Sequence, residues 1–210
     1  MDSFIRSDQY NLIKAQAHRL IRSHSSVNDS SVMEAVKSVS LEKVLQSFSS
    51  LSPEEKELID HISVIEDQED AILLLSRLKQ YVIEFPDLTE NHLKKLFPKV
   101  KKLQHPDLDE IDKKATSYLG WNDYGSNRKY LVVPFQGELI GLKGTFTQSN
   151  TKGICTICSE QEKVGMFTTT VMNSAQSVVR RGNYICQDSE LCNQNLTDLT
   201  NLHHFVKLMS

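Results

Sequence analysis

Long apolar runs are missing from this chain of 210 residues. The longest, AILLL at residues 71–75, is far shorter than the roughly 20 residues that cross a bilayer. The first residues, MDSFIRSDQY, also lack the apolar core of a secretory signal peptide. A membrane-spanning or exported protein is therefore not expected. We predict a soluble protein of the cytoplasm, where thiols stay reduced.

The chain also lacks a large excess of one charge and the short motifs of common enzymes. Its formal net charge is −3, which gives no global reason to expect a nucleic acid or an anionic membrane as partner. No H-E-x-x-H, H-x-E, Walker-type glycine loop or G-x-S-x-G occurs. Acidic pairs such as Glu54 with Glu55, and Asp107 with Asp109, lie in expected first helical turns, where capping explains them. We predict a binding protein rather than an enzyme.

Cysteine is scarce, and its four copies fall into two short stretches near the end of the chain, GICTIC and YICQDSELC. In the first stretch, two residues separate Cys155 from Cys158. This spacing lets a tight turn direct two thiolates at one metal ion. In a reducing compartment, clustered cysteines are more often metal ligands than disulfides. The first stretch is therefore predicted to be a zinc knuckle.

The second stretch has a longer spacer, QDSEL, between Cys186 and Cys192. This spacer is typical of a helix start, with Asp188 or Ser189 as the N-cap. Cys186 is then expected at the end of a strand and Cys192 in the first helical turn. A knuckle, a hairpin and a helix that carries ligands near its N-terminus make a treble clef.

Four thiolates around Zn²⁺ form a closed tetrahedral site that stabilises a fold and leaves no position for a substrate. We therefore predict one structural zinc ion per chain. Buried free cysteines or two disulfides are the alternatives. His203 and His204 could compete as ligands, but they lie far along the expected last helix from Cys192. We interpret both histidines as surface or packing residues.

The first half of the chain, to about residue 119, shows the period of amphipathic helices. Helices are expected to begin near Ser31, which has a capping-box spacing to Glu34, and near Ser52, which precedes a first-turn proline. A longer helix should follow Asp67 and continue to Phe85, before Pro86. Two more short helices are expected after caps at Thr89 and Asp107.

Beyond Gly120 the spacing between apolar residues falls towards the two-residue period of strands. Strands are predicted at residues 128–135 and 138–147, joined by Gln136 and Gly137. A second hairpin is predicted from residues 163–171 and 177–185, and one last helix from residues 189–207. Trp121 is expected to be a core anchor beside the join between the two halves.

These patterns predict a two-domain protein of the α plus α/β class. An N-terminal helical bundle should span residues 1–85. A mixed α/β domain should span residues 86–210 and contain the treble-clef zinc finger at about residues 150–207. The join is expected between Phe85 and Gly120, where the composition changes.

Two surfaces are candidates for binding. One is the basic segment HLKKLFPKVKKLQH, which could meet phosphate through Lys94, Lys95, Lys99, Lys101 and Lys102 or could be an ordinary solvated helix face. The other is the stretch VVRRGNYIC, which contains Arg180, Arg181 and Tyr184. Arginine and tyrosine are typical of interface hot spots. Strand alternation cannot place both arginines on one face, so one of them is expected to serve the fold.

With these residues in place, the chain resembles the FusB-type fusidic acid resistance proteins, which bind elongation factor G. The resemblance covers essentially the whole chain and depends most on the blocks YLVVPFQGELIGLKG, GICTIC and RGNYICQDSELCNQN. It implies a helical bundle followed by an α/β domain built around a four-cysteine treble clef. Its zinc ligands would be Cys155, Cys158, Cys186 and Cys192.

The resemblance also implies a mechanism. Proteins of this family hold the C-terminal domains of elongation factor G and promote its release from the ribosome, without modifying the antibiotic. The contact surface would lie on the zinc domain and include Arg181 and Tyr184. Ile154 stands directly before the first cysteine, where the family is expected to have an aromatic contact. The alternative function is an RNA-binding or ribosome-binding zinc protein that uses the basic segment at residues 94–102.

Overall fold

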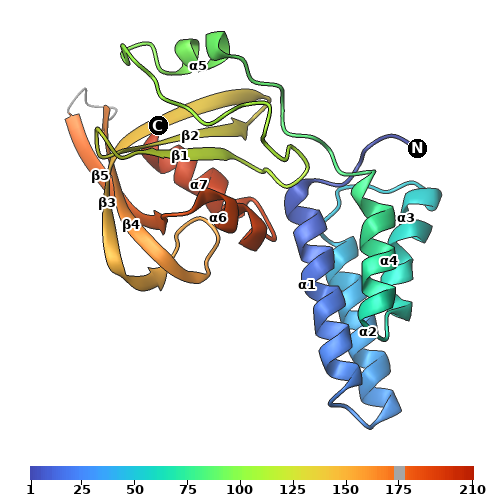
Figure 1. Ribbon diagram of the computed structural model, residues 1–210. Helices are drawn as coiled ribbons and strands as arrows, with labels where there is room; N and C mark the ends of the chain where they lie inside the picture. The colour runs from blue at the N-terminus through green and yellow to red at the C-terminus, as the bar shows by residue number, and fades with distance from the viewer. Residues whose placement is uncertain (173–177) are drawn as a thin grey trace. The chain divides into compact units, whose positions relative to one another are not determined.

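The computed structural model describes residues 1–172 and 178–210, which separate into two units, Met1–Ile83 and Glu84–Ser210. The first unit is helical, and the second is an antiparallel sheet with short helices (Figure 1). Ser177, the predicted start of the last strand, lies outside the described residues. Within the described residues, no helix has the length and apolar character needed to cross a membrane.

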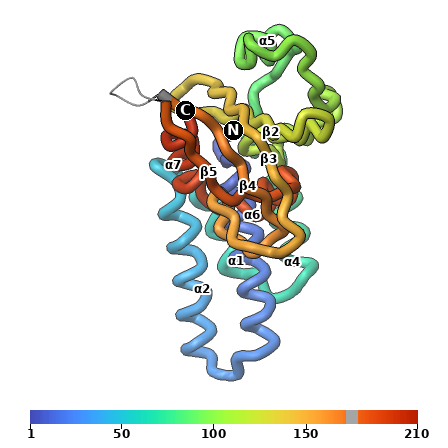
Figure 2. Tube along the Cα trace, turned by 90° about the vertical axis from the view of Figure 1, so that its left-hand side faces the viewer, coloured from blue at the N-terminus to red at the C-terminus, as the bar shows by residue number. Residues whose placement is uncertain are grey.

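Helices build the first unit, and α1 and α2 lie side by side along most of their length (Figure 2). The apolar stripes predicted from the sequence meet in its core, which includes Leu12, Ile13 and Leu20 of α1 and Met33 and Val44 of α2. The elements are α1 (Ser7–His24), α2 (Ser30–Leu45), α3 (Pro53–Asp60), the 3-10 helix η1 (His61–Val64) and α4 (Gln68–Lys79).

Side-chain caps explain where most of these helices begin. Ser52 Oγ accepts a hydrogen bond from Glu55 N at 3.2 Å, and a Glu55 carboxylate oxygen accepts one from Ser52 N at 2.7 Å, as the capping box predicts. Asp67 caps α4, also as predicted. The expected cap at Ser31 is wrong. Asp29 caps α2 instead, and its carboxylate accepts a hydrogen bond from Ser31 N at 2.8 Å.

The end of α4 also differs from the prediction, because the helix ends at Lys79 and does not reach Phe85. The residues that follow pair with the chain ahead of α1. Ile83 N donates to Ile5 O at 2.8 Å, and Ile5 N donates to Tyr81 O at 3.1 Å. A long-range backbone pairing therefore takes the hydrogen bonds that a longer helix would have used.

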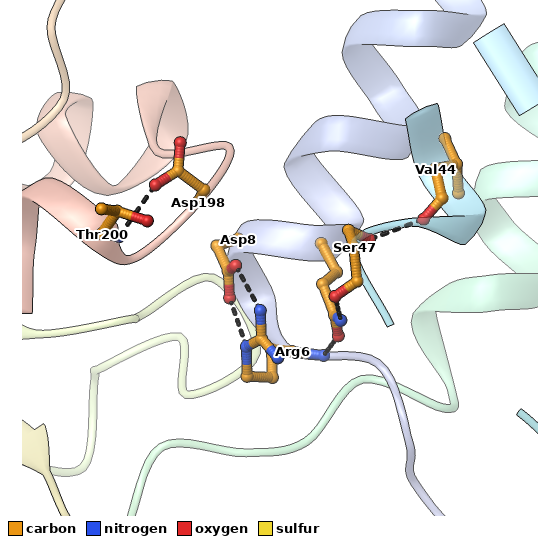
Figure 3. A network of polar contacts seen from close by, with 7 residues as sticks. Arg6, Asp8, Val44, Ser47, Asp198 and Thr200 are labelled. Atoms are coloured by element: carbon orange, nitrogen blue, oxygen red, sulfur yellow. Dashed lines mark hydrogen bonds and ion pairs between the residues drawn. The ribbon is translucent and has the colours of Figure 1, made fainter. Parts of the chain in front are cut away.

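Local polar contacts hold the start of α1 (Figure 3). The Arg6 guanidinium donates to both carboxylate oxygens of Asp8, at 2.9 and 2.8 Å. Arg6 N donates to Gln9 Oε1 at 2.8 Å, and Gln9 Nε2 donates to Ser47 O at 2.6 Å. These bonds give the Arg6 amide a partner and tie the first turn of α1 to the segment after α2.

The second unit is an antiparallel sheet in which strands adjacent in sequence are adjacent in space, in the order β1-β2-β3-β4-β5. Gln136 and Gly137 form the tight turn between β2 and β3, with φ of 52° and 84°, as predicted for this hairpin. Its elements are α5 (Glu90–Leu96), β1 (Leu119–Asp123), β2 (Arg128–Phe135), β3 (Glu138–Ile154), β4 (Gln161–Met172), β5 (Val178–Cys186), α6 (Ser189–Asn195) and α7 (Thr200–Met209).

Both faces of β2 are buried, and they contribute to different cores. Leu131 and Val133 face the core that contains the four cysteines and α7. Tyr130 and Val132 face a second core, which includes Phe97 after α5. In Figure 1, α6 and α7 lie on one side of β1 and β2 and α5 on the other. The sheet therefore separates the cysteine cluster from α5 and from Phe97.

Trp121 is a core residue, as predicted, but it lies in β1, a strand that the sequence did not indicate. Its ring stacks on Tyr130 with centroids 5.2 Å apart, and its Nε1 donates to Gln104 O at 2.6 Å. The helix expected after Asp107 is absent from the described residues at 97–118. Asp107 Oδ1 accepts from the Asp109 amide at 3.0 Å, a local turn that competes with helix formation.

Two glycines allow aromatic rings to lie against the neighbouring strands. A Cβ on Gly165 would come within 2.4 Å of the Phe146 ring, and one on Gly144 within 2.7 Å of the Phe167 ring. Both rings belong to the core that contains the cysteines. Any larger side chain at these glycines would displace a core phenylalanine.

The single last helix predicted at residues 189–207 is wrong, because α6 and α7 are separate helices. The chain turns between them, and Asp198 Oδ1 accepts a hydrogen bond from Thr200 N at 2.8 Å at the start of α7 (Figure 3). The break lets α7 cover the sheet with Leu202, Phe205 and Val206 buried.

Candidate metal centre

Four cysteines form a buried cluster in the second unit. Each offers a sulfur atom, and all four sulfurs lie within 4.8 Å of one another. Cys155 Sγ is 3.8 Å from Cys192 Sγ, and Cys158 Sγ is 3.7 Å from Cys186 Sγ. A tetrahedral zinc site with Zn–S of about 2.3 Å requires sulfurs about 3.8 Å apart, whereas a disulfide requires about 2.05 Å. The cluster fits a structural zinc ion and excludes the two disulfides that the sequence left open.

The knuckle places the first pair of ligands. Cys155 N donates to Glu160 O at 3.0 Å, which closes the turn at the end of β3. The Cys155 sulfur accepts hydrogen bonds from Ile157 N at 3.4 Å and from Cys186 N at 3.3 Å. Amides that point at a sulfur stabilise its thiolate form. The turn is therefore shaped to hold an anionic ligand.

The second pair lies where the sequence predicts it. Cys186 ends β5, and Cys192 lies in α6. Asp188 is the N-cap, and its carboxylate accepts from Glu190 N at 2.9 Å and from Leu191 N at 3.1 Å. This cap fixes the start of the helix and hence the position of Cys192 relative to the knuckle.

The sulfurs cannot all ionise without a cation. Hydrogen bonds with the neighbouring thiols lower the pKa of Cys155, and the same contacts raise the pKa of Cys186 and Cys192. Burial opposes ionisation at all three sites. Four thiolates therefore require a bound cation, and Zn²⁺ supplies the charge that such a ligand set favours.

Asn193 is part of the support around the metal centre, and no pattern in the sequence indicated this role. Its Oδ1 accepts from Ser117 N at 2.7 Å and from Tyr118 N at 3.1 Å, and its Nδ2 donates to Tyr118 O at 2.9 Å. Tyr118 is fully buried, and burial followed by the nearby Cys192 sulfur raises its pKa well above the usual value. Asn193 thus joins α6 to the start of β1.

Replacing Asn193 by alanine should destabilise the second unit by about 1–3 kcal/mol, because buried backbone groups of Ser117 and Tyr118 lose their partner. Urea unfolding of the zinc-loaded protein, followed by Trp121 fluorescence, measures this change. Gln194→Ala is the matched control, since Gln194 is exposed on the same helix. Equal stability of the two variants would contradict the role of Asn193.

The structure separates the four candidate contact residues. Ile154 and Tyr184 are exposed by 63% and 48%. Arg180 is also exposed and shares the face of β5 that carries Tyr184. Arg181 is on the opposite face, where its Nη1 donates to Leu208 O at 2.7 Å at the end of α7. As strand alternation predicts, only one of the two arginines shares the face of Tyr184.

One backbone bond joins the knuckle to β5 beside these exposed residues. Thr156 N donates to Tyr184 O at 2.8 Å. Ile154 lies two residues before Thr156 in the chain, at the end of β3. The knuckle and β5 therefore hold Ile154 and Tyr184 close to one rigid junction, directly beside the metal ligands.

The basic segment has a different character. Lys94 forms an ion pair with Glu90 at 3.1 Å on α5, and both side chains are exposed. Leu93 and Phe97 face the core, while Lys95, Lys99, Lys101 and Lys102 are exposed. This is the arrangement of a solvated face above a packed apolar one.

The histidines near the C-terminus are not members of the cysteine cluster. The His203 ring packs edge-on against Phe135, with centroids 5.3 Å apart. His203 is therefore a packing residue, as predicted from its distance along the chain from Cys192.

Comparison with known proteins adds three findings. Residues 4–86 match the family described as elongation factor G-binding protein, N-terminal, and residues 97–206 match the FBP C-terminal treble-clef zinc-finger. A solved structure, "Structure of the fusidic acid resistance protein FusC", is similar over 99% of this chain and 98% of that chain, with 32% sequence identity and a TM-score of 0.84. Among curated proteins, none matches.

Proposed function

Because the chain belongs to the family of elongation factor G-binding proteins with a C-terminal treble-clef zinc finger, we propose that it binds elongation factor G in the cytoplasm and promotes its release from the ribosome. Translation would then continue when fusidic acid stalls the factor. The proposed partner surface on the factor is its C-terminal domains. The protein would act through binding and would leave the antibiotic unchanged.

The observation that supports this proposal is the exposed pair beside the metal centre. Ile154 and Tyr184 expose apolar surface on a junction that the zinc ligands make rigid. A rigid surface loses little conformational entropy on binding, and a tyrosine with an arginine nearby is typical of an interface hot spot. We propose that Ile154, Tyr184 and Arg180 contact the factor. Arg181 would support this surface from the opposite face of β5 by holding the end of α7.

Release requires a difference in affinity. A protein that binds two states of the factor equally shifts nothing, however tightly it binds. Release follows if this protein binds the factor better in a conformation that the ribosome does not hold. The shift of the factor towards its released state cannot exceed this difference in affinity. A ribosome-release assay with fusidic acid present tests this step directly, because dissociation that is independent of the added protein would overturn it.

Replacing Tyr184 or Ile154 by alanine should weaken binding to elongation factor G by about 1–3 kcal/mol, roughly 5–150-fold in Kd. Both side chains are exposed, so the zinc-loaded fold should remain intact. Calorimetric titration with purified factor at two salt concentrations measures the change. Tyr124→Ala is the matched control, because Tyr124 is a 72% exposed tyrosine in the turn after β1.

The same titration distinguishes binding to elongation factor G from the alternative function, binding to RNA or ribosomes. One-to-one binding that persists at higher salt supports a protein partner and the proposed surface. Binding to ribosomes or RNA alone, with a steep salt dependence, would instead assign the function to the lysines at residues 94–102. Unchanged affinity in both alanine variants would place the interface elsewhere on the chain.

A further inference from the structure

Lys129 is a fully buried lysine on the side of the sheet that carries the metal centre. It has 0% exposure, and it points to the same face of β2 as Leu131 and Val133, which pack in the core with the four cysteines. Lysine is almost never fully buried unless its charge is paired. Its position therefore requires a source of negative charge inside the second unit.

The direct partners of the Lys129 ammonium group carry no net charge. Nζ donates to Gln187 O at 2.9 Å and to Asn122 Oδ1 at 3.1 Å, and it lies 5.0 Å from the centroid of the Phe146 ring. Among the described residues, no carboxylate lies within ion-pair distance of it. Two dipoles and one aromatic face only partly offset the cost of burying a cation.

Two sources of negative charge act on Lys129 from further away, the sulfurs of the metal centre and Asp188. Gln187, whose carbonyl binds Lys129, directly follows the ligand Cys186. Burial lowers the pKa of Lys129 to about 8, and the nearby sulfurs of Cys192 and Cys186, followed by Asp188, oppose this shift. A zinc ion held by four thiolates carries a net negative charge, because the ligands outweigh the metal.

Gln187 also links Lys129 to the metal centre through hydrogen bonds. Its Nε2 donates to Ser149 O at 2.7 Å and to Val164 O at 2.9 Å, which anchors it to β3 and β4. Its carbonyl accepts from Asn122 Nδ2 at 2.9 Å in addition to Lys129. The segment between Cys186 and α6 is therefore held against β1 and β2 by the residues that surround the Lys129 ammonium group.

We propose that Lys129 is the buried counter-ion of the zinc centre, and that it stabilises the metal-bound state by offsetting the net charge of the four thiolates. The reverse also holds, since the zinc-loaded centre compensates a cation that would otherwise be unpaired in the core. Zinc retention and the burial of Lys129 are then thermodynamically coupled. This inference concerns the metal centre alone and is independent of the proposed partner.

The test compares zinc release from the full-length, zinc-loaded protein and its variants. Lys129→Met keeps most of the side-chain length and removes the charge, and it should lower the affinity for zinc by roughly 10–100-fold, the range typical of groups that support metal ligands. Transfer of zinc to a chromogenic chelator measures this loss. Lys163→Met is the control, because Lys163 is exposed on β4. Zinc retention in Lys129→Met equal to that of the control would overturn the proposal.

A second variant distinguishes charge from hydrogen bonding. Lys129→Gln keeps a donor but carries no charge, so a counter-ion role predicts zinc loss close to that of Lys129→Met. Retention of zinc at the wild-type level in Lys129→Gln would show that only the hydrogen bond matters. In the Co²⁺-substituted protein, loss of the cation should shift the thiolate-to-metal charge-transfer band to lower energy, and an unshifted band would contradict the proposal.

A measurement on the unmodified protein covers the case in which both variants fail to fold. Nitrogen NMR of lysine side chains in the zinc-loaded protein reports whether Nζ of Lys129 carries a positive charge at neutral pH. A charged, solvent-protected ammonium group is the expected result. A neutral amine would overturn the counter-ion assignment.

Discussion

Replacing Cys155 by alanine is expected to abolish zinc binding and to unfold the Glu84–Ser210 unit. The Cys155 sulfur is a predicted zinc ligand and the acceptor for two amide hydrogen bonds, from Ile157 and Cys186. Structural zinc contributes about 10–16 kcal/mol to folding in zinc-finger peptides. A whole domain is stable by only about 5–15 kcal/mol. Without zinc binding, the free energy lost should therefore exceed the stability of this unit, and the unit should unfold.

Two measurements check this result. Metal analysis should find one zinc ion per chain in the unmodified protein and none in Cys155→Ala. Emission from Trp121, the single tryptophan, should shift from a buried to a solvated position, because that ring is only 9% exposed in the fold. A chelator added to the unmodified protein should give the same shift.

Glu160→Ala is the control for this experiment, because the Glu160 side chain is exposed and only its carbonyl contributes to the knuckle. Its zinc content and Trp121 emission should match those of the unmodified protein. A folded Cys155→Ala protein with unshifted emission would show that the unit is stable without the metal.

The second large effect is expected at Tyr130. Its side chain is 1% exposed, stacks on Trp121 with an interplanar angle of 12°, and meets Phe97 edge-on at 5.2 Å. Truncation of a buried aromatic residue typically costs about 3–5 kcal/mol, because apolar contacts are lost and a cavity remains. Tyr130→Ala should therefore destabilise the second unit by about that amount and loosen the segment that precedes β1.

Urea unfolding of the zinc-loaded protein measures this loss, and Trp121 is retained as the fluorescent reporter. Tyr124→Ala removes an exposed tyrosine from the same hairpin and should change stability by less than about 0.5 kcal/mol. A similar midpoint for the two variants would mean that the aromatic cluster does not stabilise the unit. A change in the slope of the transition would indicate that the native state had become less compact.

Local patterns in the sequence predicted the features that depend on near neighbours. The four-cysteine cluster follows from the spacing of Cys155 and Cys158 and from the cap at Asp188, and the structure confirms the cluster and the cap. The turn at Gln136 and Gly137 follows from the need for positive φ in a tight hairpin. The resemblance to FusB-type proteins, drawn from the cysteine stretches, is confirmed by the matched families and by the FusC structure.

Errors occurred where a distant segment competes for the same backbone or surface. The helix expected to reach Phe85 ends early because Ile83 pairs with Ile5, which lies at the other end of the first unit's sequence. The helix breaks between α6 and α7 because α7 must lie across the sheet. There, Phe205 and its neighbours cover the apolar face of the sheet. The periodicity of apolar residues within one segment cannot predict pairing or packing with a distant segment.

The sequence by itself therefore determined the grouping of the four cysteines, the helical and strand-rich halves, and the family, since each depends on residue type and short spacing. Only the tertiary structure decided that Arg181 supports α7 while Tyr184 is exposed, and that Lys129 is buried on the sheet face that carries the cysteine core. A lysine and an arginine in a strand carry no local signal of which face is covered. That is set by the strands and helices that pack on each face of the sheet.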